Sequence, residues 1–151
     1  MFGESDMLGV SKVSVDKAKF RIYLPSFCDV SKGDQLVLVE KDECIEVWSK
    51  TDILSKLKEY RDKIQESTSL EMIKYYMMLD DLVTASISKV KTMNDRKFVI
   101  GVELARKYNI CCGDMVVIEG KGNYIRIWTE DKYNEYESNL NKNSSKLRKL
   151  I

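Results

Sequence analysis

The sequence contains no histidine, a single proline and no C-x-x-C cysteine pair. Histidine is a frequent general base and metal ligand, so its absence argues against histidine-based catalysis and most zinc centres. The chain also lacks a glycine-rich phosphate loop and a paired-carboxylate motif, and Glu43, Glu46 and Glu130 are interpreted as surface charges. We therefore predict a protein that is not an enzyme, with no cofactor, no metal site and no small-molecule substrate. The four cysteines are interpreted as scattered, buried thiols in a reducing compartment.

The chain also has no long apolar run, and its formal net charge is only +1. No apolar stretch approaches the ~18 residues that span a bilayer, and the first ten residues do not resemble a signal peptide. We expect a cytoplasmic protein without a membrane partner. The 25 basic residues nearly balance the 24 acidic ones, so the total charge does not indicate a nucleic-acid partner. At 151 residues the chain is long enough to bury a core as one domain or two small ones.

The chain does contain a duplication. A strand-like stretch around Trp48 recurs around Trp128, 80 positions later, and the same offset relates the turn at Gly33 to the turn at Gly113. In both copies apolar and charged residues alternate, as on a strand with one buried face. The sequence therefore predicts two related halves.

The sequence of each half also predicts a strand that leads directly into a helix. Ser49 and Thr129 occupy N-cap positions, where a hydroxyl oxygen accepts a hydrogen bond from a free backbone amide. The preceding Trp48 and Trp128 have the spacing of hydrophobic staples, so we favour a structural role for them over stacking on a ligand. Pro25 is predicted to end an earlier strand, because proline cannot donate to a sheet ladder.

Basic residues gather at matching places in the two halves, near predicted hairpin turns. The eight cations are Lys12, Lys17, Lys19, Arg21, Lys89, Lys91, Arg96 and Lys97. Each cluster contains only one acidic residue, Asp16 in the first and Asp95 in the second. Clustered cations on turns indicate contact with DNA phosphates, and the alternative is a solvated hairpin turn.

Between the halves, apolar residues at three-and-four spacing predict helices over about 53–64 and 70–85. The apolar run 75–79 within the second of these is expected to pack on the sheet, and the alternative is a subunit interface. A short helix is predicted within 102–110 and a last helix over about 130–139. The expected division is a first half over 3–50, connecting helices over 51–86, a second half over 87–140, and a flexible basic tail over 141–151.

This organisation resembles the MraZ family of bacterial regulators, most strongly over residues 105–133. The resemblance implies an α+β fold with a mainly β core. Specifically, it implies a pseudo-two-fold double AbrB-like (SpoVT-type) β-barrel of swapped hairpins, with helices between and after the two copies. It also implies that subunits assemble into a ring and present one hairpin loop per copy to direct repeats in DNA.

The family's loop carries an Asp-x-x-x-Arg motif that leads into a strand ending in proline. The first copy keeps Arg21 and Pro25, but Asp16 lies one residue too far from the arginine. The second copy has Met93 at the acid position and Lys97 at the arginine position, with Gly101 in place of proline. A carboxylate can hold a guanidinium and aim its fork, so these departures predict reduced sequence specificity.

Taken together, the residues and the resemblance predict a DNA-binding transcriptional regulator associated with the nucleoid. Its partners are expected to be double-stranded DNA with promoter repeats and further copies of itself. The alternative is an oligomeric scaffold or protein-interaction module that has lost sequence-specific DNA binding.

Overall fold

The computed structural model describes residues 7–17, 19–87, 91–93 and 95–151. Their order along the chain is β1 (Met7–Ser14), β2 (Arg21–Tyr23), β3 (Gln35–Glu40), β4 (Ile45–Ser49), α1 (Lys50–Glu66), α2 (Leu70–Ile87), β5 (Lys91–Thr92), β6 (Lys97–Val99), α3 (Val102–Lys107), β7 (Met115–Gly122), β8 (Tyr124–Thr129), α4 (Glu130–Asn143) and the 3-10 helix η1 (Leu147–Leu150). None of the described helices is both long enough and apolar enough to cross a membrane.

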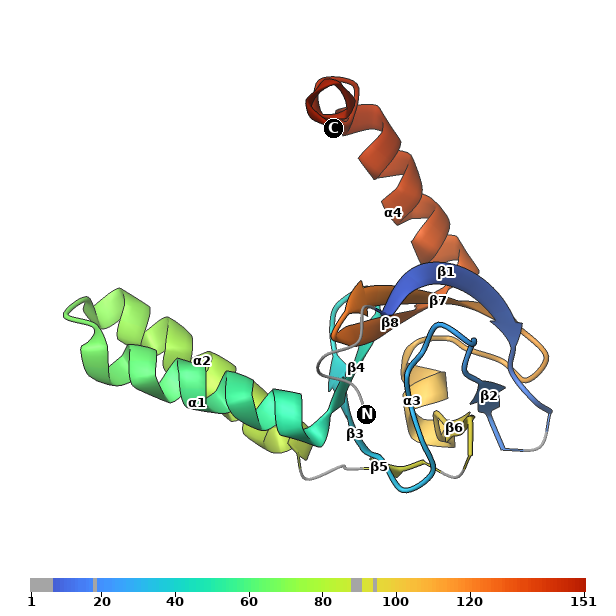
Figure 1. Ribbon diagram of the computed structural model, residues 1–151, viewed down its shortest axis with the longest axis horizontal. Helices are drawn as coiled ribbons and strands as arrows, with labels where there is room; N and C mark the ends of the chain where they lie inside the picture. The colour runs from blue at the N-terminus through green and yellow to red at the C-terminus, as the bar shows by residue number, and fades with distance from the viewer. Residues whose placement is uncertain (1–6, 18, 88–90, 94) are drawn as a thin grey trace.

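The strands form one large and one small antiparallel sheet (Figure 1). The six-stranded sheet has the order β1-β7-β8-β4-β3-β5, and β2 pairs with β6 in a separate two-stranded sheet. Each half contributes a strand to the other half, because β1 pairs with β7 and β5 pairs with β3. The α+β class with a mainly antiparallel sheet is confirmed. Over the described residues the large sheet ends at β1 and β5 and does not close, so the expected barrel is not confirmed.

The halves meet at the centre of the sheet, where β4 pairs with β8. Ile45 lies opposite Ile127 and Val47 lies opposite Ile125, and all four side chains are buried in the main core. These residues alternate along their strands with residues on the opposite face, as the strand period of two requires. The sequence repeat thus becomes a packed interface between two copies.

The opposite face of the sheet carries the two tryptophans and the helices that follow them. Ser49 Oγ accepts a hydrogen bond from the Asp52 amide at 3.1 Å and caps α1. Thr129 caps α4 in the same way. Trp48 packs with Ile53 in one buried cluster, and the Trp128 ring lies 6.0 Å from the Tyr133 ring in another. Each tryptophan therefore contacts the first turns of the helix that it precedes.

The helices extend well beyond the sheet. In Figure 1 the α1–α2 hairpin projects to one side and α4 projects in another direction. The expectation that the apolar run 75–79 packs on the sheet is wrong, because Tyr75, Met77 and Met78 are 55%, 52% and 67% exposed. The hairpin joins the sheet at one end only, so just the last turns of α2, with the buried Val83, reach it.

Two glycines hold equivalent turns. Gly33 and Gly113 have φ angles of 91° and 87°, in a region that residues with a Cβ rarely adopt. Their amides donate at 2.9 Å to the carbonyls of Met93 and Val15, in each case across to the other half of the molecule. The two positions thus perform the same task in the two halves.

The second half contains the predicted short helix, and its last helix is longer than expected. The predicted helix within 102–110 is present as α3, with Ala105 buried, while the matching stretch of the first half forms only turns. α4 continues to Asn143, so it includes the first residues of the predicted tail. Further along, Arg148 Nη2 donates to Asn141 Oδ1 at 2.7 Å, which ties η1 back to α4.

Candidate nucleic-acid interface

The strands that follow the two basic turns pair with each other. β2 and β6 form a short antiparallel ribbon in which Ile22 lies opposite Phe98, and both of these side chains are buried in the core. The alternate positions form what we call the outer face of the ribbon, namely Arg21, Tyr23, Lys97 and Val99. The ribbon lies at the opposite end of the molecule from the α1–α2 hairpin (Figure 1). Arg21 of the first half and Lys97 of the second half therefore lie on the same surface.

The first turn, which leads from β1 into β2, is organised by Asp16, and residue 18 within it lies outside the described residues. Arg21 Nε donates to Asp16 Oδ2 at 2.6 Å, and the Lys19 amide donates to Oδ1 at 2.9 Å. The Asp16 amide donates in return to the Arg21 carbonyl at 2.8 Å, and Phe20 takes a positive φ of 53°. These hydrogen bonds, first that of the Lys19 amide and then that of Arg21, hold the pKa of the Asp16 carboxyl well below its usual range.

The expectation that Asp16 is too far away to hold Arg21 is therefore wrong. The additional residue is taken up by the turn, because Phe20 adopts the left-handed region and brings Arg21 back towards Asp16. Sequence spacing alone does not show such a fold-back. The side chain of Arg21 remains about one third exposed, at 34%.

The second turn, residues 93–96, is built differently. Met93 is 3% exposed, and its backbone exchanges hydrogen bonds with Gly33 and Asp34 as Val15 does with Gly113 and Asp114. Met93 is therefore the structural counterpart of the buried Val15, and its assignment to the acid position is wrong. Residue 94 lies outside the described residues.

Lys97 lies over an aromatic ring on the outer face. Its Nζ is 5.6 Å from the centre of the Tyr23 ring on the neighbouring strand, and Tyr23 is 58% exposed. This distance is within the range of a cation–π interaction. No carboxylate pairs with Lys97 in the part of the chain that the structure describes. Sequence analysis did not identify Tyr23 as part of the site, although its alternation with Arg21 along β2 was a usable signal.

Arg96 is directed towards the protein and not towards solvent. Its Nε donates to the Leu24 carbonyl at 3.1 Å, and its Nη2 donates to the carbonyls of Pro25 and, at 3.0 Å, Cys28. Arg96 was expected to contact DNA. In the structure its guanidinium group instead links the second turn to the segment that follows β2. The reason is that backbone carbonyls of the other half surround its guanidinium group.

The other residues that were predicted to contact DNA do not belong to the outer face of the ribbon. Lys12 lies on β1, with its Nζ 3.2 Å from Glu130 Oε2 at the start of α4. Lys17 and Lys19 are exposed on the first turn. Lys89 and the side chain of Lys91 lie outside the described residues. The structure thus brings Arg21 and Lys97 onto one ribbon, leaves Lys17 and Lys19 exposed on the first turn, and places Lys12 towards α4.

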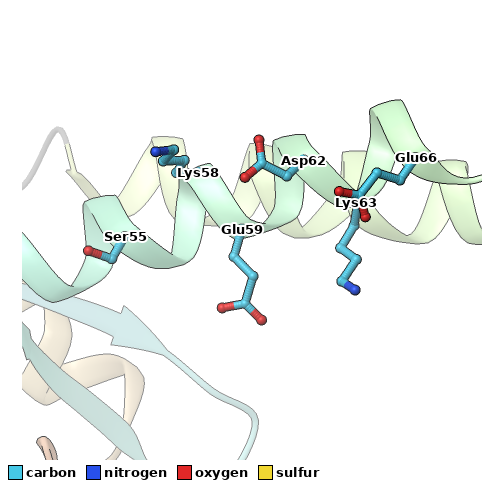
Figure 2. A pocket seen from close by; sticks show the side chains of 6 residues that line it. All are labelled: Ser55, Lys58, Glu59, Asp62, Lys63 and Glu66. Carbon is cyan, nitrogen blue, oxygen red and sulfur yellow. The ribbon is translucent and has the colours of Figure 1, made fainter.

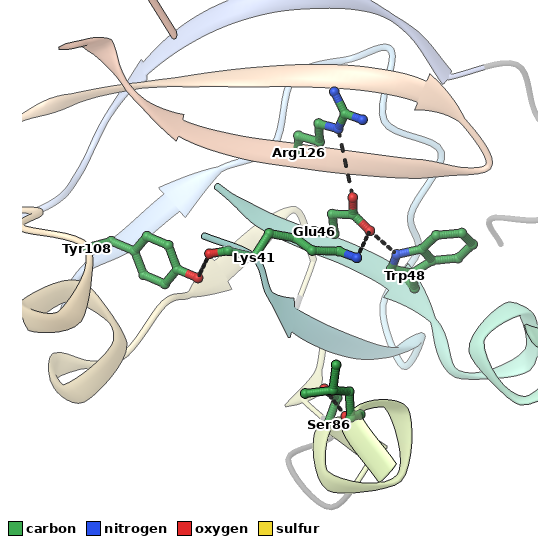
Figure 3. A network of polar contacts seen from close by, with 7 residues as sticks. Lys41, Glu46, Trp48, Ser86, Tyr108 and Arg126 are labelled. Atoms are coloured by element: carbon green, nitrogen blue, oxygen red, sulfur yellow. Dashed lines mark hydrogen bonds and ion pairs between the residues drawn. The ribbon is translucent and has the colours of Figure 1, made fainter. Parts of the chain in front are cut away.

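Two buried carboxylates lie close to one arginine on the opposite face of the sheet, and Figure 3 shows Glu46 of this cluster with Trp48 and Arg126. Glu46 accepts from the Trp48 indole at 3.0 Å, and Glu119 accepts from the Trp128 indole at 3.2 Å. Arg126 lies between the carboxylates, 3.9 Å from Glu46 and 3.5 Å from Glu119. The interpretation of Glu46 as a surface charge is wrong, since it is 9% exposed. Both carboxylates hold tryptophans in place, which is a structural role.

Two depressions elsewhere do not resemble ligand sites. One, of about 410 Å³, runs along the solvent side of α1 and is lined by side chains of both charge signs, including Lys58, Glu59 and Lys63 (Figure 2). A smaller one, of about 220 Å³, lies at the start of α4 beside Asp114 and Glu130. The described residues contain no group of three or more Cys, Asp or Glu side chains placed to hold a metal ion.

The fold and the ribbon together define the class of protein. It is an α+β chain with mainly antiparallel strands, built from two related halves, and each half places a cation on the same surface. No family model matches the chain. It is 28% identical over 129 residues to the transcriptional regulator MraZ of Mycoplasma capricolum subsp. capricolum, covering 85% of this chain and 92% of that relative. It is also 28% identical over 127 residues to the transcriptional regulator MraZ of Mycoplasma mycoides subsp. mycoides, covering 83% and 90%. The chain is thus similar to MraZ transcriptional regulators over most of its length.

Both relatives are named as transcriptional regulators and not as enzymes.

Proposed function

We propose that the protein is a DNA-binding transcriptional regulator that acts as a homo-oligomer on repeated promoter sites. In this proposal the first and second turns and the outer face of the ribbon contact the DNA. Several subunits, arranged as a ring, place such ribbons at regular intervals along the duplex. We expect the protein to act in the bacterial cytoplasm, at the nucleoid.

The observation that carries the proposal is the pairing of β2 with β6. Arg21 and Lys97 come from different halves of the chain, yet they occupy the same face of one ribbon. Arginine and lysine are the residues that most often neutralise DNA phosphates. A few phosphate contacts give only weak, salt-sensitive binding, so one ribbon is not sufficient alone. Repetition on an oligomer increases the avidity for DNA whose repeats match the ribbon spacing.

The exposed face of α2 supports self-association. Tyr75, Met78 and Leu82 follow helical spacing on one side of α2 and are 55%, 67% and 62% exposed. Monomeric proteins rarely expose contiguous apolar patches of this kind. The exchange of β1 and β5 between the halves likewise supports a swapped-hairpin architecture, as in the family that the chain resembles.

The test is a mobility-shift titration with duplexes that carry direct repeats from the protein's own promoter region. The double variant Arg21→Ala, Lys97→Ala is compared with Lys58→Ala, Lys63→Ala, which removes the same charge from the solvent side of α1. We expect the first variant to lose at least about tenfold in affinity, since each lost phosphate contact weakens binding, and the second to bind as the wild type does. Equal binding by both variants at every salt concentration contradicts the proposal.

A second candidate is an oligomeric scaffold without specific DNA binding. The exposed apolar face of α2, which has no covering element among the described residues, favours it. Light scattering together with the titration separates the two candidates. A stable oligomer that shifts no duplex supports the scaffold.

A further inference from the structure

We propose that Cys111 and Cys112 form a redox-modification site, at which a low-molecular-weight disulfide converts the two adjacent thiols reversibly into a disulfide bond. The bond distorts residues 111–114, which we call the cysteine turn, and this distortion loosens the first turn and weakens the binding of DNA. The effect on DNA binding rests on the proposed function, whereas the formation of the disulfide does not.

The cysteine turn does not need cysteine in order to form. In its counterpart in the first half, residues 31–34, the Asp34 amide donates to the Ser31 carbonyl at 3.0 Å and the Ser31 amide donates to Asp34 Oδ2 at 2.8 Å. The same two hydrogen bonds, with the same lengths, join Cys111 and Asp114. Serine and lysine occupy the positions of the two cysteines in that counterpart. The thiols are therefore not required by the backbone of the turn.

The two thiols are not part of the core either. Cys111 and Cys112 are exposed, whereas Cys28 and Cys44 are buried. An exposed thiol is accessible to an oxidant, and a second thiol on the next residue can attack the product that the first one forms. Neither core packing nor the hydrogen bonds of the turn account for two adjacent exposed cysteines, and the chemistry of a dithiol does.

The reaction proceeds by two thiol–disulfide exchanges. In the first, the thiolate of one cysteine attacks a sulfur of the small disulfide, whose S–S bond breaks. The protein then carries a mixed disulfide, and one small thiol leaves with the proton that the cysteine has lost. In the second, the neighbouring thiolate attacks the protein sulfur of the mixed disulfide, the other small thiol leaves in the same way, and the bond between Cys111 and Cys112 closes. Two protein thiols are oxidised while one small disulfide is reduced to two thiols, so atoms and electrons balance.

A disulfide between neighbouring residues distorts the turn that contains them. Their Cα atoms lie about 3.8 Å apart across a trans peptide bond, whereas disulfides usually join Cα atoms roughly 4.4–6.8 Å apart. The peptide group between the two cysteines must therefore move, and it includes the Cys111 carbonyl that accepts from the Asp114 amide. A strained, exposed disulfide is also readily reduced, so the modification is reversible in a reducing environment.

The cysteine turn holds the residue that leads into the first turn. The Gly113 amide donates to the Val15 carbonyl at 2.9 Å, and the Val15 amide donates to the Asp114 carbonyl at 2.8 Å. Asp16 follows Val15 and is the brace that accepts from Arg21 Nε at 2.6 Å. Distortion of the cysteine turn therefore displaces the residue next to the brace.

The effect is confined to one of the two basic turns. The Lys17 side chain passes over the cysteine turn, with its Cε 4.0 Å from the position that a Cβ at Gly113 would have. The second turn is held by the serine-containing counterpart, through hydrogen bonds that join Met93 to Gly33 and Asp34. Oxidation therefore loosens the first turn and leaves the second unchanged, so it weakens DNA binding without abolishing it.

The test of the modification treats the folded full-length protein with oxidised glutathione. After an acid quench, the protein is denatured in iodoacetamide and its intact mass is measured. We expect the treated wild type to take up two labels fewer than the reduced protein and to carry no glutathione. Cys112→Ser has no second thiol to expel glutathione, so it should retain one molecule. A wild type that keeps all four thiols, retains glutathione or joins a second chain through a disulfide overturns the inference.

Hydrogen exchange and mobility shifts measure the consequence. Oxidation should speed the exchange of the Val15 and Gly113 amides at least about tenfold. It should weaken binding to the promoter-repeat duplex about 3- to 30-fold. Both changes should reverse with dithiothreitol and be absent in the charge-matched control Cys111→Ser, Cys112→Ser. A disulfide that leaves the exchange unchanged, or leaves the affinity of a DNA-binding protein unchanged, overturns the inference. If the reduced wild type binds no duplex, the proposed function fails, and the thiol counts and exchange rates still decide whether the cysteine turn is a redox site.

Discussion

Trp48 of the first half stacks on Tyr124 of the second, with ring centroids 4.3 Å apart and an angle of 5° between the planes. The two residues lie opposite each other on β4 and β8, so this stack closes one end of the contact between the halves. Trp48 is 8% exposed and also packs on α1, which connects the contact to the helical hairpin.

Replacement of Tyr124 tests the importance of this stack. We expect Tyr124→Ala to lower the free energy of unfolding by about 1–3 kcal/mol, because an aromatic pair and buried surface are both lost. Tyr124→Phe keeps the ring and should lose less than about 1 kcal/mol. Urea denaturation followed by tryptophan fluorescence measures both values. Equal losses in the two variants would mean that the hydroxyl group, and not the stack, provides the stability.

The close approach of β1 to β7 depends on Gly120. A Cβ at this position would overlap the backbone carbonyl of Met7 on the edge strand. We therefore expect Gly120→Ala to cost about 1–3 kcal/mol, since β1 must shift or the strand pair must open. Thermal unfolding should show a decrease of roughly 2–4 °C per kcal/mol for a chain of this size. The neighbouring exposed Lys121→Ala should leave the midpoint nearly unchanged, and a similar result for Gly120→Ala would contradict the close packing.

Asp16 makes the first turn sensitive to acid. The Lys19 amide and then Arg21 hold the pKa of its carboxyl below the ordinary 3.8. A carboxyl whose pKa is lower in the folded state stabilises the fold above its unfolded pKa, and this contribution disappears as the pH falls towards the folded value. The stability difference between the wild type and Asp16→Asn should therefore be largest near about pH 6 and should shrink below about pH 4. Urea unfolding across this range measures the difference, and a gap that does not change with pH would contradict the brace.

The cysteines should react in two classes. Burial raises the pKa of Cys28 to about 12 and that of Cys44 to about 11, so both remain protonated near neutral pH. Cys111 and Cys112 are exposed, so the expectation that all four thiols are buried is wrong for this pair. Brief treatment of the folded protein with iodoacetamide should label only the exposed pair, and denaturation should make all four thiols available. Intact mass spectrometry counts the labels, with Cys111→Ser, Cys112→Ser as the control that should remain unlabelled while folded.

The apolar face of α2 should control self-association. Met78 is 67% exposed on that face, so Met78→Glu places a charge where a second subunit would bury it. We expect light scattering to give a lower mass for this variant than for the wild type. The free energy of unfolding of the separated chain should change by less than about 0.5 kcal/mol, because an exposed side chain contributes little. Lys58→Glu, on the solvent side of α1, should leave the mass unchanged; a mass that is also unchanged in Met78→Glu would place the interface elsewhere.

Local sequence patterns were sufficient to predict much of the fold. The repeat around Trp48 and Trp128 predicted two related halves, and the hydroxyl residues before α1 and α4 predicted their starts. Alternation predicted the strands around Trp48 and Trp128, but the expectation of a single buried face is wrong for β4, because helices cover its second face as well. The short helix predicted within 102–110 is present as α3. These features depend on residues that are close together in the chain.

The site was only partly predictable. Sequence analysis identified Arg21 and Lys97 as paired positions, but it could not show that β2 and β6 form one ribbon. It also gave Arg96 the wrong surroundings, since the carbonyls that it contacts lie about 70 residues away in the chain.

The sequence by itself therefore determined the duplication, the strands, the helix starts and the positions of the basic turns, because propensity, alternation and capping act over a few residues. Only the tertiary structure decided which strands pair across the halves, which cations face solvent, and how Asp16 reaches Arg21. Those outcomes depend on contacts between distant segments and on one left-handed residue in a turn, and neither has a signature in local sequence spacing.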